Sequence, residues 1–234
     1  MPRLSNRRIV ATAGYLALAA ADSYLAGRRG VGARRARHVT KPLLMPALAT
    51  STRMAVGEHN TGLTRGVRAA QLFSWGGDVA LLGRGEPSFL AGVGSFFAAH
   101  LSYIGGFGSV KDSRAGVDAP GAKAGAATWV AAAPVMAVAA GRKDPVLRLP
   151  IAAYAAVLST MFATSTMLDT ELRASARRRI LAGTSLFLLS DSLLGVQKFL
   201  RAEPSAALET AVMATYTTGQ WLIAEGAVAA SRAH

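Results

Sequence analysis

The chain has 234 residues, of which 51% are hydrophobic and only 7% aromatic, and its mean hydropathy is positive. This excess of small apolar residues, alanine and glycine above all, is typical of closely packed helices in lipid and argues against a water-soluble core. The absence of cysteine excludes disulfides, thiolate metal sites and cysteine nucleophiles.

The net charge of +13 raises the question of nucleic-acid binding, which requires a continuous basic face with interleaved aromatic residues. Most Lys and Arg residues lie instead in short clusters between long uncharged stretches, as in RRGVGARRARHVTK (28–41) and RASARRR (173–179). Such clusters are typical of loops anchored at lipid headgroups. We therefore expect membrane lipids, and no nucleic acid, as partners.

Apolar runs long enough to cross the hydrocarbon layer, roughly 20 residues each, recur along the whole chain. They predict an all-α fold, a polytopic integral membrane bundle of about eight transmembrane helices in a single domain, residues 1–234. The predicted spans are 8–26, 40–56, 66–83, 87–109, 125–141, 147–168, 178–200 and 206–230. Because Arg53 interrupts the second span and Pro134 the short fifth, six or seven spans remain an alternative.

The connections between these spans are short, and the longest polar stretch, residues 111–125, is predicted to be a flexible loop. Eight spans place both termini on one side, and a slight excess of Lys and Arg there favours the cytoplasmic side. The richness in Ala, Gly and Arg is typical of GC-rich genomes, so we expect the cytoplasmic membrane of a bacterium. Faces of small residues would permit a homodimer.

Polar residues inside the spans are the candidates for function. Lys41 opens the second span in TKPL, where its side chain could reach headgroup depth. The third span carries Asp78 in LFSWGGDVALLG, and a carboxylate near the middle of a membrane must face the bundle interior, a water-filled cavity or a partner. Gln71 and Ser74 recur with Asp78 at spacings of three and four, which places all three on one inward face.

Later spans add further polar residues. These are His100 and Tyr103 on the fourth, Asp191 on the seventh, and Tyr216 and Gln220 on the eighth. Together with the third span, they could form one central polar pocket.

Each of these residues also has a structural interpretation. Interhelical hydrogen bonding explains Gln71, Ser74 and Gln220 well. The carboxylates of Asp78 and Asp191 are costly to bury in lipid and are seldom kept for stability alone, so we favour a function for them. Acidic residues near span ends, Asp22 among them, are expected to be solvated or to pair within loops.

Five sequence blocks carry a resemblance to a known family. They are TKPL, LFSWGGDVALLG, FLAGVGSFFAAHLSYIGGF, SLFLLSDSLLGVQKF and MATYTTGQWLIA. In order and spacing they resemble the YhhN-like membrane family, whose characterised members are lysoplasmalogenases, over roughly residues 8–225. The resemblance implies an eight-helix membrane hydrolase that cleaves the vinyl ether bond of a lysophospholipid, releasing a fatty aldehyde and a glycerophospho-alcohol.

The resemblance also implies a set of site residues. The two aspartates of the family map onto Asp78 and Asp191. The histidine and tyrosine of the fourth-span block map onto His100 and Tyr103. The tyrosine and glutamine of the last block map onto Tyr216 and Gln220.

Vinyl ether hydrolysis requires a proton donor and an anion, because protonation of the outer alkene carbon creates an oxocarbenium ion to which water adds. Asp78 and Asp191 could supply both, as paired carboxylates do in glycoside hydrolysis. The sequence does not rank the two, but the neutral neighbours of Asp78 on its face favour it as the acid. His100 and Tyr103 would bond to the pair or position water, and Lys41 would meet the lipid phosphate. No metal or cofactor is required.

Two other functions remain open. A proton-coupled transporter of lipids or small molecules could use the same aspartates. Such transporters often have internal repeats with broken helices, of which the GD and SD motifs, four spans apart, are only a loose echo. A scaffold protein, in which the polar residues only hold helices together, is the third interpretation.

Overall fold

The computed structural model describes residues 6–57, 60–116, 119–203 and 205–231. Within these ranges the chain is all-helical, with eight α-helices and no strand. The helices are Asn6–Ala26 (α1), Val31–Val56 (α2), Gly62–Ala80 (α3), Glu86–Gly108 (α4), Pro120–Lys143 (α5), Arg148–Thr166 (α6), Ala174–Gly195 (α7) and Ala206–Ser231 (α8). A 3-10 turn, η1 (Pro145–Leu147), precedes α6, and a π-helical turn, η2 (Val196–Leu200), extends α7.

Two helices begin well before the spans predicted for them. Helix α2 begins at Val31, well before the predicted start at residue 40, because the Arg and Ala residues of the basic cluster are good helix formers. Helix α5 begins at Pro120, a residue favoured in the first helical turn, so residues 120–125 of the predicted loop are helical. Residues 117 and 118 of that loop lie outside the described ranges.

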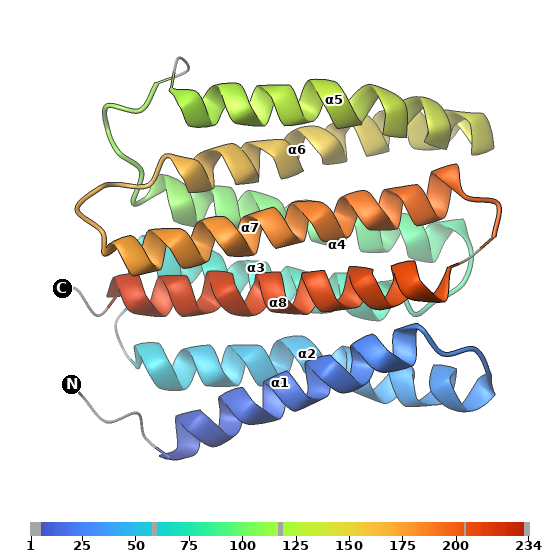
Figure 1. Ribbon diagram of the computed structural model, residues 1–234, viewed down its shortest axis with the longest axis horizontal. Helices are drawn as coiled ribbons and strands as arrows, with labels where there is room; N and C mark the ends of the chain where they lie inside the picture. The colour runs from blue at the N-terminus through green and yellow to red at the C-terminus, as the bar shows by residue number, and fades with distance from the viewer. Residues whose placement is uncertain (1–5, 58–59, 117–118, 204, 232–234) are drawn as a thin grey trace.

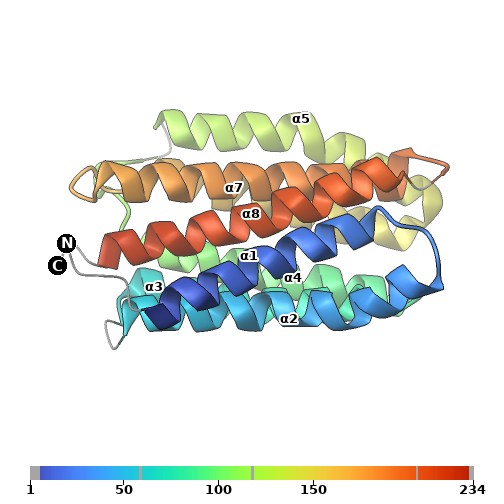
Figure 2. The same ribbon diagram turned by 60° about the horizontal axis from the view of Figure 1, so that its bottom comes forward.

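The helices lie side by side along the long axis, and the start of α1 and the end of α8 lie at the same end of the bundle (Figure 1). Helix α8 is central: it packs against α7, α1, α2 and α3, whereas α5 packs mainly on α6 (Figure 2). The connections that follow α1, α3, α5 and α7 lie at the opposite end, called the distal end below (Figure 1).

The bundle buries several polar groups within an apolar core and exposes many large apolar side chains. Asp22, Asp78 and His100 are buried, and Leu72 and Val130 are among many exposed large hydrophobic residues. So much exposed apolar surface is unusual for a water-soluble protein. Among the described residues, five helices are long and apolar enough to cross a membrane: α1, α4, α5, α6 with η1, and α7 with η2. These features mark a membrane protein.

Helices that cross closely do so at glycines. At the crossing of α7 and α8, a methyl group added to Gly183 would lie 2.7 Å from the carbonyl oxygen of Gly219. At the crossing of α3 and α4, the same addition to Gly66 would lie 2.5 Å from the Cα atom of Gly106. Small residues allow such close backbone contact between helices in lipid. The two crossings hold together the helix pairs that carry the site described below.

Gly183→Ala is therefore expected to lower the free energy of unfolding in detergent by about 1–3 kcal/mol, the usual cost of overpacking. Gly94→Ala on α4 is the matched control, because an added methyl group there meets no atom within 4 Å. Thermal unfolding of the two variants measures the difference. Equal midpoints would show that the α7–α8 crossing tolerates a larger residue.

Candidate active site

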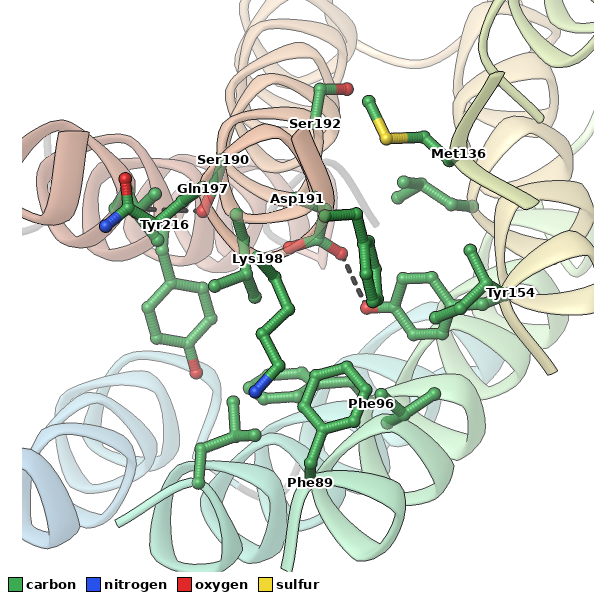
Figure 3. A pocket seen from close by; sticks show the side chains of 18 of the residues that line it. Phe89, Phe96, Met136, Tyr154, Ser190, Asp191, Ser192, Gln197, Lys198 and Tyr216 are labelled. Atoms are coloured by element: carbon green, nitrogen blue, oxygen red, sulfur yellow. Dashed lines mark hydrogen bonds between the residues drawn. The ribbon is translucent and has the colours of Figure 1, made fainter. Parts of the chain in front are cut away.

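A cavity of about 410 Å³ lies in the distal half of the bundle, and every helix from α2 to α8 contributes to its wall. This volume lies within the range of small-molecule sites. The sequence predicts a central polar pocket, but the wall is mainly apolar, with polar groups at a few positions. Asp78 of α3 and Asp191 of α7 are both on it. Figure 3 shows Asp191, Tyr216 and Lys198 around the same space.

Asp78 is held by groups from two other helices. Its side chain is 1% exposed, and the hydroxyl of Tyr216 on α8 donates to its Oδ2 atom at 2.8 Å. The ammonium of Lys41 on α2 lies 3.5 Å from its Oδ1 atom, and the Lys41 side chain is only 9% exposed. Lys41 is thus a buried partner of Asp78. The neighbours of Asp78 on its own helix face are neutral, as expected, but α2 adds a cation beside it.

Two prolines explain how α2 is fixed against α3 next to this pair. Pro46 has no backbone N–H, so the carbonyl oxygen of Pro42 has no donor at the usual position within the helix. The indole nitrogen of Trp75 on α3 donates to that oxygen instead, at 3.0 Å. Trp75 is three residues before Asp78, and Pro42 follows Lys41 directly. The bond therefore joins the two segments that carry the ion pair.

Asp191 has a different set of partners. The hydroxyl of Tyr154 on α6 donates to its Oδ2 atom at 2.5 Å, and the Nε2 atom of His100 on α4 lies 3.7 Å from the same oxygen. The Nδ1 atom of His100 lies 2.6 Å from the carbonyl oxygen of Phe96 and must donate to it, because a carbonyl only accepts. Nε2 is buried and has no hydrogen-bond partner among the described residues. With its proton on Nδ1, the neutral form of His100 would direct the lone pair of Nε2 toward Asp191.

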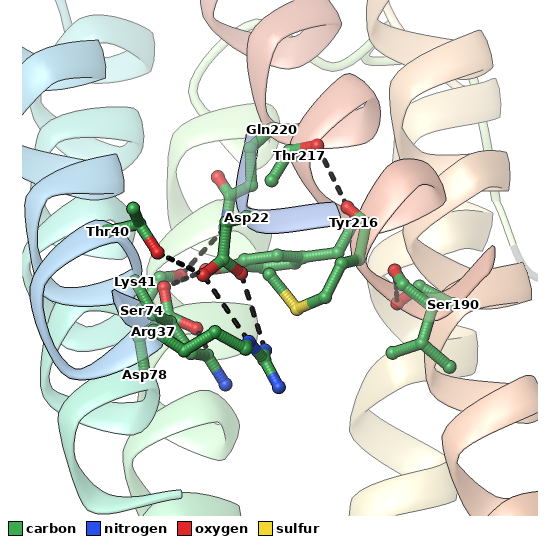
Figure 4. Close-up of polar contacts among 12 residues, drawn as sticks. Asp22, Arg37, Thr40, Lys41, Ser74, Asp78, Ser190, Tyr216, Thr217 and Gln220 are labelled. Atoms are coloured by element: carbon green, nitrogen blue, oxygen red, sulfur yellow. Dashed lines mark hydrogen bonds and ion pairs between the residues drawn. The ribbon is translucent and has the colours of Figure 1, made fainter. Parts of the chain in front are cut away.

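The remaining predicted residues take part in hydrogen bonds between helices, and Figure 4 shows two of them, Ser74 and Gln220. The amide of Gln220 on α8 donates to the Ser74 hydroxyl at 2.9 Å and accepts a bond from the hydroxyl of Tyr103. Gln71 donates to Thr52 of α2 at 3.2 Å. All of these side chains are buried, so the predicted inward face of α3 is confirmed. Their bonds join α2, α3, α4 and α8.

Asp22 corrects another expectation. It was expected to be solvated or to pair within a loop, but it is fully buried, and its Oδ1 atom accepts a bond from Thr40 at 2.6 Å. Arg37 pairs with it at 3.3 Å and also lies on the cavity wall. Figure 4 shows this group beside Lys41 and Asp78. Asp22 lies at the end of α1, where the return of α2 covers it.

The predicted site residues fall into two groups. Four lie on the cavity wall: Lys41, Asp78, Asp191 and Tyr216. Five are buried off the wall: Gln71, Ser74, His100, Tyr103 and Gln220. Among the described residues His100 contacts Asp191 and not Asp78. Tyr103, which lies about one helical turn after His100 on α4, bonds to Gln220 and to neither aspartate. In the described ranges, no three His, Asp or Glu side chains come together as a metal site requires.

Sequence reasoning missed two residues of the wall. Tyr154 is a lone tyrosine in the apolar run PIAAYAAVL, the same signal that singled out Tyr103. Lys198 is the next-to-last residue of the block SLFLLSDSLLGVQKF, and it was assigned no role from the sequence. Both share the cavity with the aspartates.

A model of one protein family, described as the YhhN family, matches residues 36–227. The chain belongs to the YhhN family. The YhhN match runs from within α2 into α8 and includes every predicted site residue, together with Tyr154 and Lys198. Asp22 lies outside it. No curated protein and no solved structure gave a match to the chain.

Proposed function

We propose that this YhhN-family chain is a membrane hydrolase that cleaves the vinyl ether bond of lysoplasmalogen-type lysophospholipids, giving a fatty aldehyde and a glycerophospho-alcohol. One observation carries the proposal: Asp78 and Asp191 share the wall of one mainly apolar cavity, yet each has its own set of partners. Family membership is consistent with it. In this account all eight helices cross the cytoplasmic membrane of a bacterium, with both termini in the cytoplasm.

The partners favour Asp191 as the proton donor and Asp78 as the anion, the reverse of the assignment from the sequence. Lys41 supplies a counter-charge for an ionised Asp78, whereas no Lys or Arg of the described residues forms an ion pair with Asp191. The tyrosine bonds do not separate the two aspartates, because each aspartate accepts one. A protonated Asp191 can direct its hydrogen at the lone pair of His100 or at a substrate. Environments that separate two carboxylates in this way are the usual basis of acid–base assignments.

The reaction begins when Asp191 transfers its proton to the outer alkene carbon of the vinyl ether. The resulting oxocarbenium ion is stabilised by the carboxylate of Asp78, held in place by Lys41 and Tyr216. Water then adds to the carbon that bears the oxygen and loses a proton, which returns to Asp191 directly or through His100. The hemiacetal collapses to the aldehyde and the alcohol, so the net change is addition of one water.

A proton-coupled transporter is the alternative that shares these residues. Helices α3 and α7 run without a break through Asp78 and Asp191. Transporters more often place such groups where helices are discontinuous, since broken helices supply free backbone groups for ions and substrates. The continuous helices therefore support fixed catalytic groups.

The wild-type protein in nanodiscs is expected to release aldehyde from 1-alkenyl lysophospholipids with choline or ethanolamine headgroups. The 1-acyl lysophospholipid with the same headgroup is the control, because an ester lacks the alkene carbon that accepts the proton. Aldehyde is measured by trapping with a hydrazine reagent. A folded protein that releases none would contradict the proposal, and substrate-dependent proton flux in proteoliposomes would support transport instead.

A further inference from the structure

The distal end of the cavity carries a cation that the proposed chemistry does not use. The π-helical turn η2 continues α7 and places three consecutive residues, Gln197, Lys198 and Phe199, on the cavity wall. Turns of this kind are rare and are frequent at functional sites. The Lys198 ammonium lies 4.7 Å from the centre of the Phe89 ring, and Figure 3 shows its side chain reaching into the cavity.

The charges on the wall separate Lys198 from the other cations. Arg37 is paired with Asp22, and Lys41 is paired with Asp78. Among the described residues no carboxylate forms an ion pair with Lys198, and this includes the two other carboxylates of the wall, Asp191 and Glu209. A ring contact stabilises an ammonium but leaves its hydrogen-bond donors free for an anion.

The separation of Lys198 from Asp191 suits the phosphate of a lysophospholipid. Lys198 follows Asp191 by seven residues, which is at most about 10 Å along the helix axis at the α-helical rise of about 1.5 Å per residue, since residues 196–198 lie in the π-helical turn. In a lysophospholipid the glycerol unit separates the vinyl ether from the phosphate. A lipid whose vinyl ether lies at Asp191 thus has its phosphate toward the distal end, and its chain among Ala132, Met136 and Leu158 of α5 and α6.

We propose that Lys198 binds the phosphate of a single-chain glycerophospholipid and makes this cavity selective for phosphate-bearing lipids. The role replaces the one that the sequence assigned to Lys41, whose ammonium is engaged by Asp78. The lipid class rests on the proposed function, but the binding does not require turnover. Failure of the hydrolase proposal and failure of this one can therefore be told apart.

The test compares the binding of 1-acyl lysophosphatidylcholine with that of a monoacylglycerol of the same chain, to the full protein in nanodiscs. The wild type is expected to prefer the phospholipid by about tenfold, the value of one charge-assisted hydrogen bond. Lys198→Gln is expected to abolish the preference and Lys198→Arg to keep most of it. The matched control is Arg84→Gln, which removes an exposed charge near the distal end but off the wall, and which is expected to change nothing.

Three results would overturn the proposal. The first is equal binding of both lipids by the wild-type protein. This result does not depend on whether any variant folds. The second is a Lys198→Gln variant with the wild-type preference. The third is displacement of the lysophospholipid by inorganic phosphate alone, which would indicate a site for the free ion. Loss of the preference in Lys198→Gln supports the phosphate site even if no aldehyde is ever released.

Discussion

Asp191→Asn is expected to lower the turnover number for aldehyde release by about 10²–10⁴-fold, the contribution of a positioned general acid. Asparagine has the same shape and can still accept the bond that Tyr154 donates at 2.5 Å, so the helices should pack as before. It has no proton acidic enough for the alkene carbon. The rate is measured under saturating alkenyl lysophospholipid, with thermal unfolding of the same samples.

The control for this variant is Glu203→Gln, which neutralises an exposed carboxylate near the start of α8. It is expected to keep wild-type turnover and stability. If Asp191→Asn retained full turnover, Asp191 would not be the acid, and the partners of the two aspartates would have been misread. A variant that lost activity only because it unfolded would be recognised by its lower midpoint.

The ion pair of Lys41 and Asp78 gives the second large effect, on stability and activity together. Asp78→Asn leaves a buried ammonium without its counter-charge, and Lys41→Met leaves a buried carboxylate. Each is expected to lower the free energy of unfolding in detergent by about 3–5 kcal/mol, as removal of one partner of a buried pair does. The double variant Lys41→Met/Asp78→Asn should regain most of that loss, because no charge is then left unpaired.

Activity should behave differently from stability in this double-mutant cycle. The double variant lacks the anion that stabilises the oxocarbenium ion, so it should stay inactive although it is folded. Recovery of stability without recovery of turnover would separate the catalytic role of Asp78 from its structural one. Additive losses of stability would show that the pair is not coupled, and an active double variant would remove Asp78 from the mechanism.

The eight α-helices of the described residues agree with the eight apolar runs of the sequence, and the inward face of α3 was readable as well. Five of these helices are long and apolar enough to cross a membrane, and a span by each of the others stays a prediction. Spacings of three and four place Gln71, Ser74 and Asp78 on one face whatever surrounds them. Boundaries such as Val31 and Pro120 were missed, because a basic or polar segment that continues a helix leaves no break in propensity.

The partners of the site residues were beyond the sequence. Tyr216 and Asp78 are separated by 138 residues, and the contact depends on how α8 packs against α3. Lys41 could be assigned to headgroups until the fold of α2 showed it buried beside Asp78. Asp22 was expected to be solvated because it lies near the end of α1. The packing of α2 over it, which the sequence does not reveal, buries it. The sequence shows which residues share a face of one helix, but it does not show which helices pack against that face.

Aldehyde release in deuterated buffer tests the central claim most directly, because it follows the proton that the mechanism transfers. The wild-type protein should yield an aldehyde with one deuterium on the carbon next to the carbonyl group, and Asp191→Asn should yield almost no aldehyde. An aldehyde without deuterium at that carbon, or undiminished release by Asp191→Asn, would contradict protonation of the vinyl ether by Asp191.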